Sequence, residues 1–158
     1  MGSYLNPGNK GFQERLNSEI YVDKTGLIEK TNAVLDTRQK FLCVSRPRRF
    51  GKSMAADMLA AYYERGEDAD LLFRSLKISK AESYRAHLNQ YDVIKVNIQE
   101  FLSMTGSMDE MLSMLKKYLV FDLMEHFDDV RFRDESNLIQ VMKDIYAKTK
   151  RAFVILID

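Results

Sequence analysis

A glycine-lysine-serine tripeptide at Gly51, Lys52 and Ser53 is the feature of this chain that most constrains its fold. It lies between an apolar run, residues 40–45, and a segment, residues 52–65, whose apolar side chains recur at helical spacing. The run has no polar alternation, which predicts a strand buried on both faces of a parallel sheet. A strand, a glycine-containing turn and a helix that opens with lysine and serine are typical of a phosphate-binding loop.

Each residue type in the tripeptide has a chemical reason for its position. Gly51 lets backbone N–H groups approach a phosphate with no Cβ in the way. Lys52 supplies a mobile positive charge for β- and γ-phosphates, and the Ser53 hydroxyl is a ligand for Mg²⁺. Met54 follows in the first helical turn, where the helix dipole favours anions. We therefore predict that this segment binds a nucleotide.

The front of the loop departs from the generic phosphate-binding pattern. Arg46 stands at the position of its first glycine, and Pro47 fixes φ and removes an N–H donor. Arg48, Arg49 and Phe50 complete the predicted site. Two interpretations of Arg48 and Arg49 stay open: solvated loop charge, or guanidinium groups that hold phosphate or a nucleic-acid backbone.

The rest of the chain alternates helices with strands. Residues 1–20 are predicted as an irregular N-terminal arm, because Pro7, Gly8 and Gly11 interrupt it. Asp23 and Ser136 are predicted helix caps. Further helices are predicted at residues 23–35, 70–76, 81–89, 108–127 and 136–148, and further strands at residues 93–98 and 153–157. The alternation indicates an α/β fold, and the helix over 108–127 has an unusually wide apolar face.

An acidic residue after a buried strand is a second element of nucleotide hydrolysis, because it orients Mg²⁺. Asp158 follows the apolar residues 153–157 and has this character. In ATPases that use this element, a residue just beyond it positions the attacking water, and the sequence ends at Asp158. We therefore expect nucleotide binding without assuming turnover.

Four segments carry a resemblance to a known family: residues 21–28, 45–53, 72–78 and 153–158. Over residues 4–158 the chain resembles the predicted AAA-ATPase-like family of bacterial proteins, in which arginine takes the place of the generic glycine at Arg46. The resemblance implies a P-loop NTPase of the ASCE/AAA type, a three-layer αβα fold with a parallel sheet, and ATP and Mg²⁺ as cofactors. It implies Lys52 and Asp158 as catalytic residues, and Ser53 and Asp158 as Mg²⁺ ligands. It also implies that Tyr21, Asp23 and Lys24 border the adenine site.

Family members often continue into a nuclease-like C-terminal region, which residues 1–158 do not contain. In this ATPase class the strand order is 5-1-4-3-2, and only strands 1–3 are predicted here. The predicted domain is therefore incomplete and ends at the Walker B strand, which leaves a gap beside strand 1. Three explanations would account for this gap: the chain is a fragment of a longer protein, strands 1 and 3 pair directly, or a partner chain fills the gap. We favour the fragment.

Composition and charge exclude some classes of function. The net charge is +1, from 24 Lys and Arg against 23 Asp and Glu, so no global basic field favours nucleic acid. Cys43 is the only cysteine, which excludes an internal disulfide, and we predict that it is a buried core residue. No apolar run is long enough to span a membrane and no secretory signal is present, so a cytoplasmic location is expected.

Three function hypotheses follow. The first is an ATP-binding module that couples nucleotide state to a partner or a further domain; no guanine-selecting motif occurs, so ATP is favoured over GTP. The second is a nucleic-acid module that holds phosphate through Arg46, Arg48 and Arg49. The third is a non-catalytic scaffold whose helix over 108–127 docks a partner or a second copy.

Weaker candidates lie outside the loop. His126 among acidic residues suggests a solvated helix end rather than a metal site. Asn97, Gln99 and Glu100 end a predicted strand on the side where ligands bind in open α/β folds. They are interpreted as a polar strand end, with phosphate or water sensing as the alternative.

Overall fold

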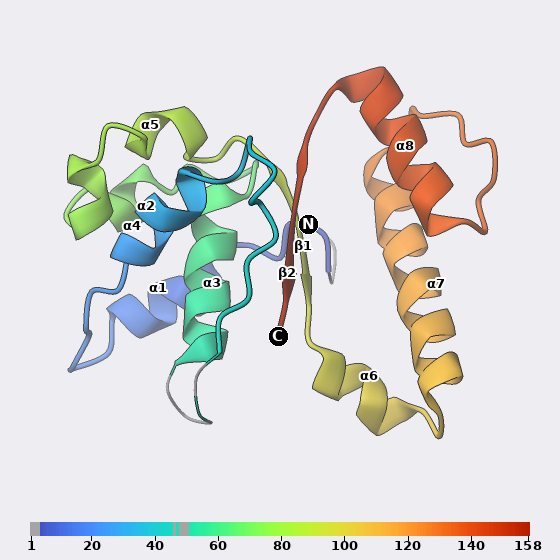
Figure 1. The fold of residues 1–158 in the computed structure, drawn as a ribbon, viewed down its shortest axis with the longest axis horizontal. Coiled ribbons are helices and arrows are strands. Elements are labelled where there is room, and N and C mark those ends of the chain that lie inside the picture. Colours follow the sequence, from blue (N-terminus) through green and yellow to red (C-terminus); the bar gives the residue numbers. More distant parts are fainter. Residues whose placement is uncertain (1–3, 46, 48–50) are drawn as a thin grey trace. The chain divides into compact units, whose positions relative to one another are not determined.

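The structure is a computed structural model that describes residues 4–45, 47 and 51–158. These residues form two compact units: Gly8–Tyr91, and residues 4–7 with Asp92–Asp158. Figure 1 labels the helices and strands of both units.

The unit Gly8–Tyr91 is helical in its described part. Its longest helix, α3, packs against α1, and α3 is buried from Met58 to Tyr63. The ring of Phe12 stacks on Phe73 at 4.9 Å between centroids, and Tyr62 meets Phe73 edge-on at 5.4 Å. These aromatic contacts form the centre of the unit. Its elements are α1 (Lys10–Leu16), α2 (Gly26–Asn32), α3 (Lys52–Tyr63), α4 (Asp70–Phe73), the 3-10 helix η1 (Lys77–Lys80) and α5 (Tyr84–His87).

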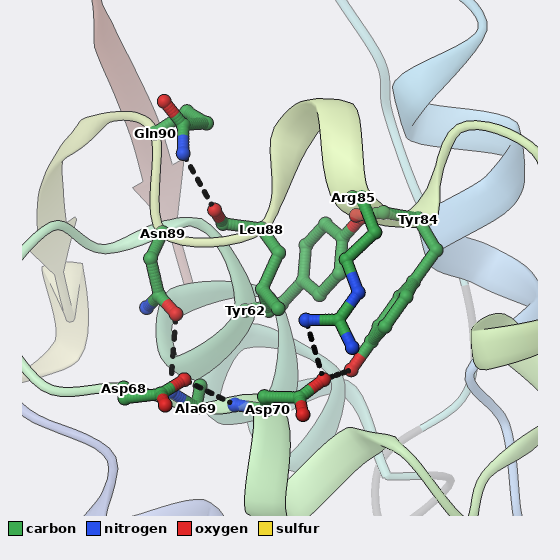
Figure 2. A network of polar contacts seen from close by, with 9 residues as sticks. All are labelled: Tyr62, Asp68, Ala69, Asp70, Tyr84, Arg85, Leu88, Asn89 and Gln90. Carbon is green, nitrogen blue, oxygen red and sulfur yellow. Dashed lines mark hydrogen bonds and ion pairs between the residues drawn. The ribbon is translucent and has the colours of Figure 1, made fainter.

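A polar network holds the two chain segments on either side of η1 (Figure 2). The Tyr84 hydroxyl donates to the Asp70 carboxylate at 2.8 Å, and Arg85 forms an ion pair with the same carboxylate at 3.0 Å. Asn89, with a positive φ of 58°, accepts a hydrogen bond of 3.0 Å from the Ala69 amide. The network therefore ties the start of α4 to α5 and to the residues after it.

The structure corrects two predictions about the N-terminal part of this unit. Residues 1–20 were expected to be irregular, but Lys10–Leu16 form α1 because Phe12 is fully buried against Phe73. The helix expected from Asp23 starts at Gly26 with Thr25 as its N-cap residue. Asp23 instead accepts a hydrogen bond from the Thr25 amide at 2.9 Å, a turn that precedes the helix.

The strand predicted over residues 40–45 is wrong. These residues form no regular element, and Phe41 and Val44 are 87% and 50% exposed. Cys43 is exposed as well, so its predicted role as a core residue is also wrong. A strand needs a neighbour for its backbone groups, and no strand within the described ranges pairs with this segment. An apolar run predicts burial, but it does not show that a neighbouring strand is present to pair with it.

The second unit is built on two parallel strands, β1 (Asp92–Val96) and β2 (Phe153–Ile157). Ile94 lies opposite Ile155 in the register, and Val96 lies opposite Ile157. The N-terminal residues add to the other edge of β1, where Leu5 forms an antiparallel bridge with Ile94. Both predicted strands are confirmed within a residue or two, and so is the α/β class.

Three helices connect β1 to β2: α6 (Ile98–Met104), α7 (Met108–His126) and α8 (Leu138–Thr149). Helices α7 and α8 pack side by side (Figure 1). Their shared core is apolar and includes Ile94, Phe101, Leu119, Leu123 and Ile145. No described helix is long and apolar enough to cross a membrane.

Helices α7 and α8 confirm the predicted helices at 108–127 and 136–148, whereas α6 was not predicted. The cap of α8 is Asn137 rather than Ser136, since its side-chain oxygen accepts from the amides of Ile139 and Gln140. The apolar face of α7 is only partly covered, because Phe121 is 66% exposed.

Candidate functional site

The predicted phosphate-binding residues Gly51, Lys52 and Ser53 lie at the start of α3. Gly51 is the N-cap residue and has φ 80° and ψ 26°, a left-handed conformation that side chains disfavour. Its carbonyl accepts the first helical hydrogen bond, from Ala55 N at 2.9 Å. The amides of the first turn point out of the end of a helix, and Lys52 and Ser53 supply that turn. The structure thus places the predicted glycine, lysine and serine at a helix N-terminus.

A second lysine reaches this turn from another part of the unit Gly8–Tyr91. The Nζ atom of Lys24 lies 3.5 Å from the position that a Cβ would take on Gly51. Lys24 is exposed, and its carbonyl accepts from the Leu27 amide at 3.0 Å where α2 begins. No sequence pattern predicts that Lys24 lies beside Gly51.

The residues on either side of Lys24 are held by hydrogen bonds. Asp23 accepts from the Thr25 hydroxyl at 2.6 Å and from the Lys77 amide at 2.7 Å. The Thr25 hydroxyl oxygen also accepts from the Ile78 amide at 3.1 Å. Burial opposes ionisation of Asp23, but these hydrogen bonds and the Lys77 charge hold its pKa below the ordinary value. We call Asp23, Thr25, Lys77 and Ile78 the Asp23 clamp.

The second unit brings together the ends of its two strands. The Asp158 amide donates to the Val96 carbonyl at 2.9 Å, and the Ile98 amide donates to the Asp158 carbonyl at 2.9 Å. Asp158 therefore lies beside Asn97 at the carboxyl ends of β2 and β1. This edge is where parallel sheets bind ligands.

The polar residues after β1 have structural partners. The Asn97 side chain accepts from the Gln99 amide at 3.0 Å and caps α6. Glu100 accepts from the Tyr4 hydroxyl at 3.2 Å, and burial together with the Glu100 charge raises the pKa of Tyr4 to about 12. The interpretation as a polar strand end accounts for Asn97 and Glu100.

Residues 8–158 match the family model described as predicted AAA-ATPase. The chain belongs to the AAA-ATPase-like family. No curated protein and no solved structure matches it. Membership of the AAA-ATPase-like family supports a nucleotide-binding, ATPase-like module. The suspected family is thereby confirmed.

Two of the segments that resemble the AAA-ATPase-like family meet in the structure. Residues 21–28 contain Asp23 and Thr25, and residues 72–78 contain Lys77 and Ile78. The Asp23 clamp joins these segments and presents Lys24 at the start of α3. Sequence reasoning identified both segments but not their contact.

Part of the predicted loop lies outside the described residues, namely Arg46, Arg48, Arg49 and Phe50. Of the remaining predicted residues, Pro47 and Ser53 are exposed, and Lys52 and Met54 are half-buried.

Across the described ranges, no group of three His, Cys, Asp or Glu residues is arranged to hold a metal ion. The His126 ring instead meets the Phe127 ring edge-on at 4.8 Å. A nucleotide-linked Mg²⁺ needs only one or two protein ligands beside phosphate oxygens, so its fit depends on the serine at the start of α3.

Proposed function

We propose that this chain is a nucleotide-binding module that takes the phosphates of Mg-ATP at the N-terminus of α3. One observation carries the proposal: Gly51 adopts a left-handed conformation directly before a 12-residue helix that opens with Lys52 and Ser53. This geometry lets helix amides face an anion, and the residue types are those that bind phosphate and Mg²⁺.

Each residue has a role in the proposal. The Lys52 ammonium binds the β- and γ-phosphate oxygens, and the Ser53 hydroxyl is a ligand of the magnesium ion. The first-turn amides, up to Met54, add the positive end of the helix dipole. Magnesium, when bound, neutralises phosphate charge. Asp158 is proposed as the carboxylate that orients the magnesium ion during ATP hydrolysis.

The sequence supports a further set of phosphate contacts. Arg46, Pro47, Arg48, Arg49 and Phe50 precede the glycine in the sequence, and the guanidinium groups of the three arginines suit bidentate bonds to phosphate oxygens. We propose that these five residues also bind the nucleotide. The chain's membership of the AAA-ATPase-like family and the position of these residues directly before Gly51 support this proposal.

The proposal is tested by the stability that Mg-ATP confers. A ligand that binds only the folded state stabilises it, by about 2.7 kcal/mol when its concentration is 100 times Kd. Thermal denaturation of the wild type should shift upward with Mg-ATP, whereas that of Lys52→Ala should shift much less. Lys30→Ala, which removes an exposed lysine of α2, is the matched control and should behave as the wild type. Equal shifts in Lys52→Ala and wild type would refute the proposal.

A further inference from the structure

We propose that Lys24 is a second phosphate-binding lysine, which holds the phosphate tail of the nucleotide beside Gly51. The inference rests on the proposed function and adds a residue to that site. It is carried by the position of the Lys24 ammonium, by the charges around it and by the Asp23 clamp.

The position is close enough for a shared ligand. The Lys24 Nζ atom lies 3.5 Å from where a Cβ would stand on Gly51. The ammonium therefore lies directly beside the turn that precedes α3. A phosphate seated on the first-turn amides of α3 would lie within reach of this ammonium, because lysine has a flexible four-carbon stem.

The positive charges in this region favour the binding of an anion. The N-terminus of α3 carries the positive end of the helix dipole, and a cation is unfavourable there. Lys24 adds a full positive charge at that end. Among the ion pairs formed by described residues, none includes Lys24. A phosphate group placed between these positive charges would convert their repulsion into attraction.

The backbone around Lys24 is fixed, which reduces the entropy lost on binding. Asp23 and Thr25 are bonded to the amides of Lys77 and Ile78, at 2.7 and 3.1 Å. The Lys24 carbonyl accepts a hydrogen bond from the Leu27 amide, where α2 begins. Only the lysine side chain has to be ordered when the ligand arrives, so the clamp acts as a positioning device.

A purely structural role accounts less well for Lys24. Its side chain is exposed, and no buried carboxylate accompanies it among the described ion pairs. Neutralising it should leave the stability of the nucleotide-free protein unchanged or slightly higher, since it removes repulsion. A structural lysine would instead lower that stability when replaced.

The test is isothermal calorimetry of Mg-ATP and of adenosine with four proteins: wild type, Lys24→Met, Lys24→Arg and the control Lys30→Met. Loss of one hydrogen bond to a charged group weakens binding by roughly tenfold to a hundredfold. We expect Lys24→Met to lose Mg-ATP affinity by this factor, Lys24→Arg to retain most of it, and Lys30→Met to match the wild type. The loss should shrink as KCl is raised, because salt screens exposed charges. Adenosine, which has no phosphate, should bind all four proteins alike.

Three results would overturn the inference. Equal Mg-ATP affinity of Lys24→Met and Lys30→Met would show that Lys24 does not contact the ligand. An equal loss for adenosine would place Lys24 at the nucleoside instead of the phosphates. A lower melting temperature of nucleotide-free Lys24→Met would indicate a structural role. Lys52→Ala separates the two proposals: if it abolishes Mg-ATP binding while Lys24→Met binds as the wild type, only the inference about Lys24 fails.

Discussion

The Asp23 carboxylate accepts a hydrogen bond of 2.7 Å from the backbone amide of Lys77. The same carboxylate accepts from the Thr25 hydroxyl, so one charged group joins the entry to α2 with the start of η1. Both segments carry the resemblance to the AAA-ATPase-like family that the sequence shows, and the clamp brings them into contact. It fixes the residue whose side chain lies beside Gly51.

The clamp predicts a pH-dependent stability. Asp23→Asn should destabilise the protein at pH 7 by about 1.5–3 kcal/mol, because hydrogen bonds to a charged acceptor are lost. The folded-state pKa of Asp23 is lowered, so its contribution is present above the pKa of the unfolded chain. That contribution disappears as the pH falls through the folded-state pKa.

Urea denaturation at several pH values, from neutral to below the folded-state pKa of Asp23, measures this difference. The wild type and Asp23→Asn should converge at the acid end. Glu82→Gln, at an exposed carboxylate, should show no such convergence. A gap between wild type and Asp23→Asn that stays constant with pH would contradict the role of the ionised carboxylate.

A pair of glycine substitutions tests the turn before α3. Gly51→Ala should destabilise by about 1–2 kcal/mol, because alanine is strained at a φ of 80°. It should also weaken Mg-ATP binding, because relief of that strain would shift the first-turn amides of α3 that face the phosphates.

Gly26→Ala is the matched control, because a Cβ at Gly26 meets nothing within 4 Å and Gly26 opens a helix. It should stabilise the protein by about 0.5–1 kcal/mol and leave binding unchanged. Chemical denaturation measures both variants. Equal effects of the two substitutions would show that the left-handed turn does not form.

The N-terminal segment of the second unit gives a prediction on stability. Asn6 has a φ of 48°, donates to the buried Asp92 carboxylate at 3.1 Å and accepts from the Val93 amide at 2.8 Å. Asn6→Ala should destabilise by about 2–4 kcal/mol, because it leaves buried polar groups unsatisfied and strains the backbone.

Asn6→Gly separates the two causes, since glycine tolerates the positive φ but lacks the amide group. It should recover only the part of the loss that comes from strain, about 1–2 kcal/mol. Thermal or urea denaturation of the wild type, Asn6→Ala and Asn6→Gly measures the two contributions. Full recovery in Asn6→Gly would mean that the bonds to Asp92 and Val93 contribute nothing.

Long, periodic segments of this chain were predictable from sequence. Helix α7 follows from apolar steps of three and four over its whole length, and β2 follows from five consecutive apolar residues. Both patterns are local, so no knowledge of distant partners is needed. The helix that begins at Lys52 was predictable for the same reason.

Features that depend on distant partners were not predictable. Residues 40–45 have the composition of a buried strand but no pairing neighbour among the described residues. Helix α1 has Phe12 as its single buried side chain, too little for a periodic signal, and it folds because Phe73 stacks on it. The approach of Lys24 to Gly51 depends on the Asp23 clamp, whose two halves lie far apart in the sequence.

The central claim is that Lys52, at the left-handed turn before α3, binds the phosphates of a nucleotide. Isothermal calorimetry of Mg-ATP with the wild type and Lys52→Ala, beside Lys30→Ala as the control, tests it most directly. We expect binding to the wild type and to Lys30→Ala, and a loss of affinity of roughly tenfold or more in Lys52→Ala. The same affinity in all three proteins would contradict it.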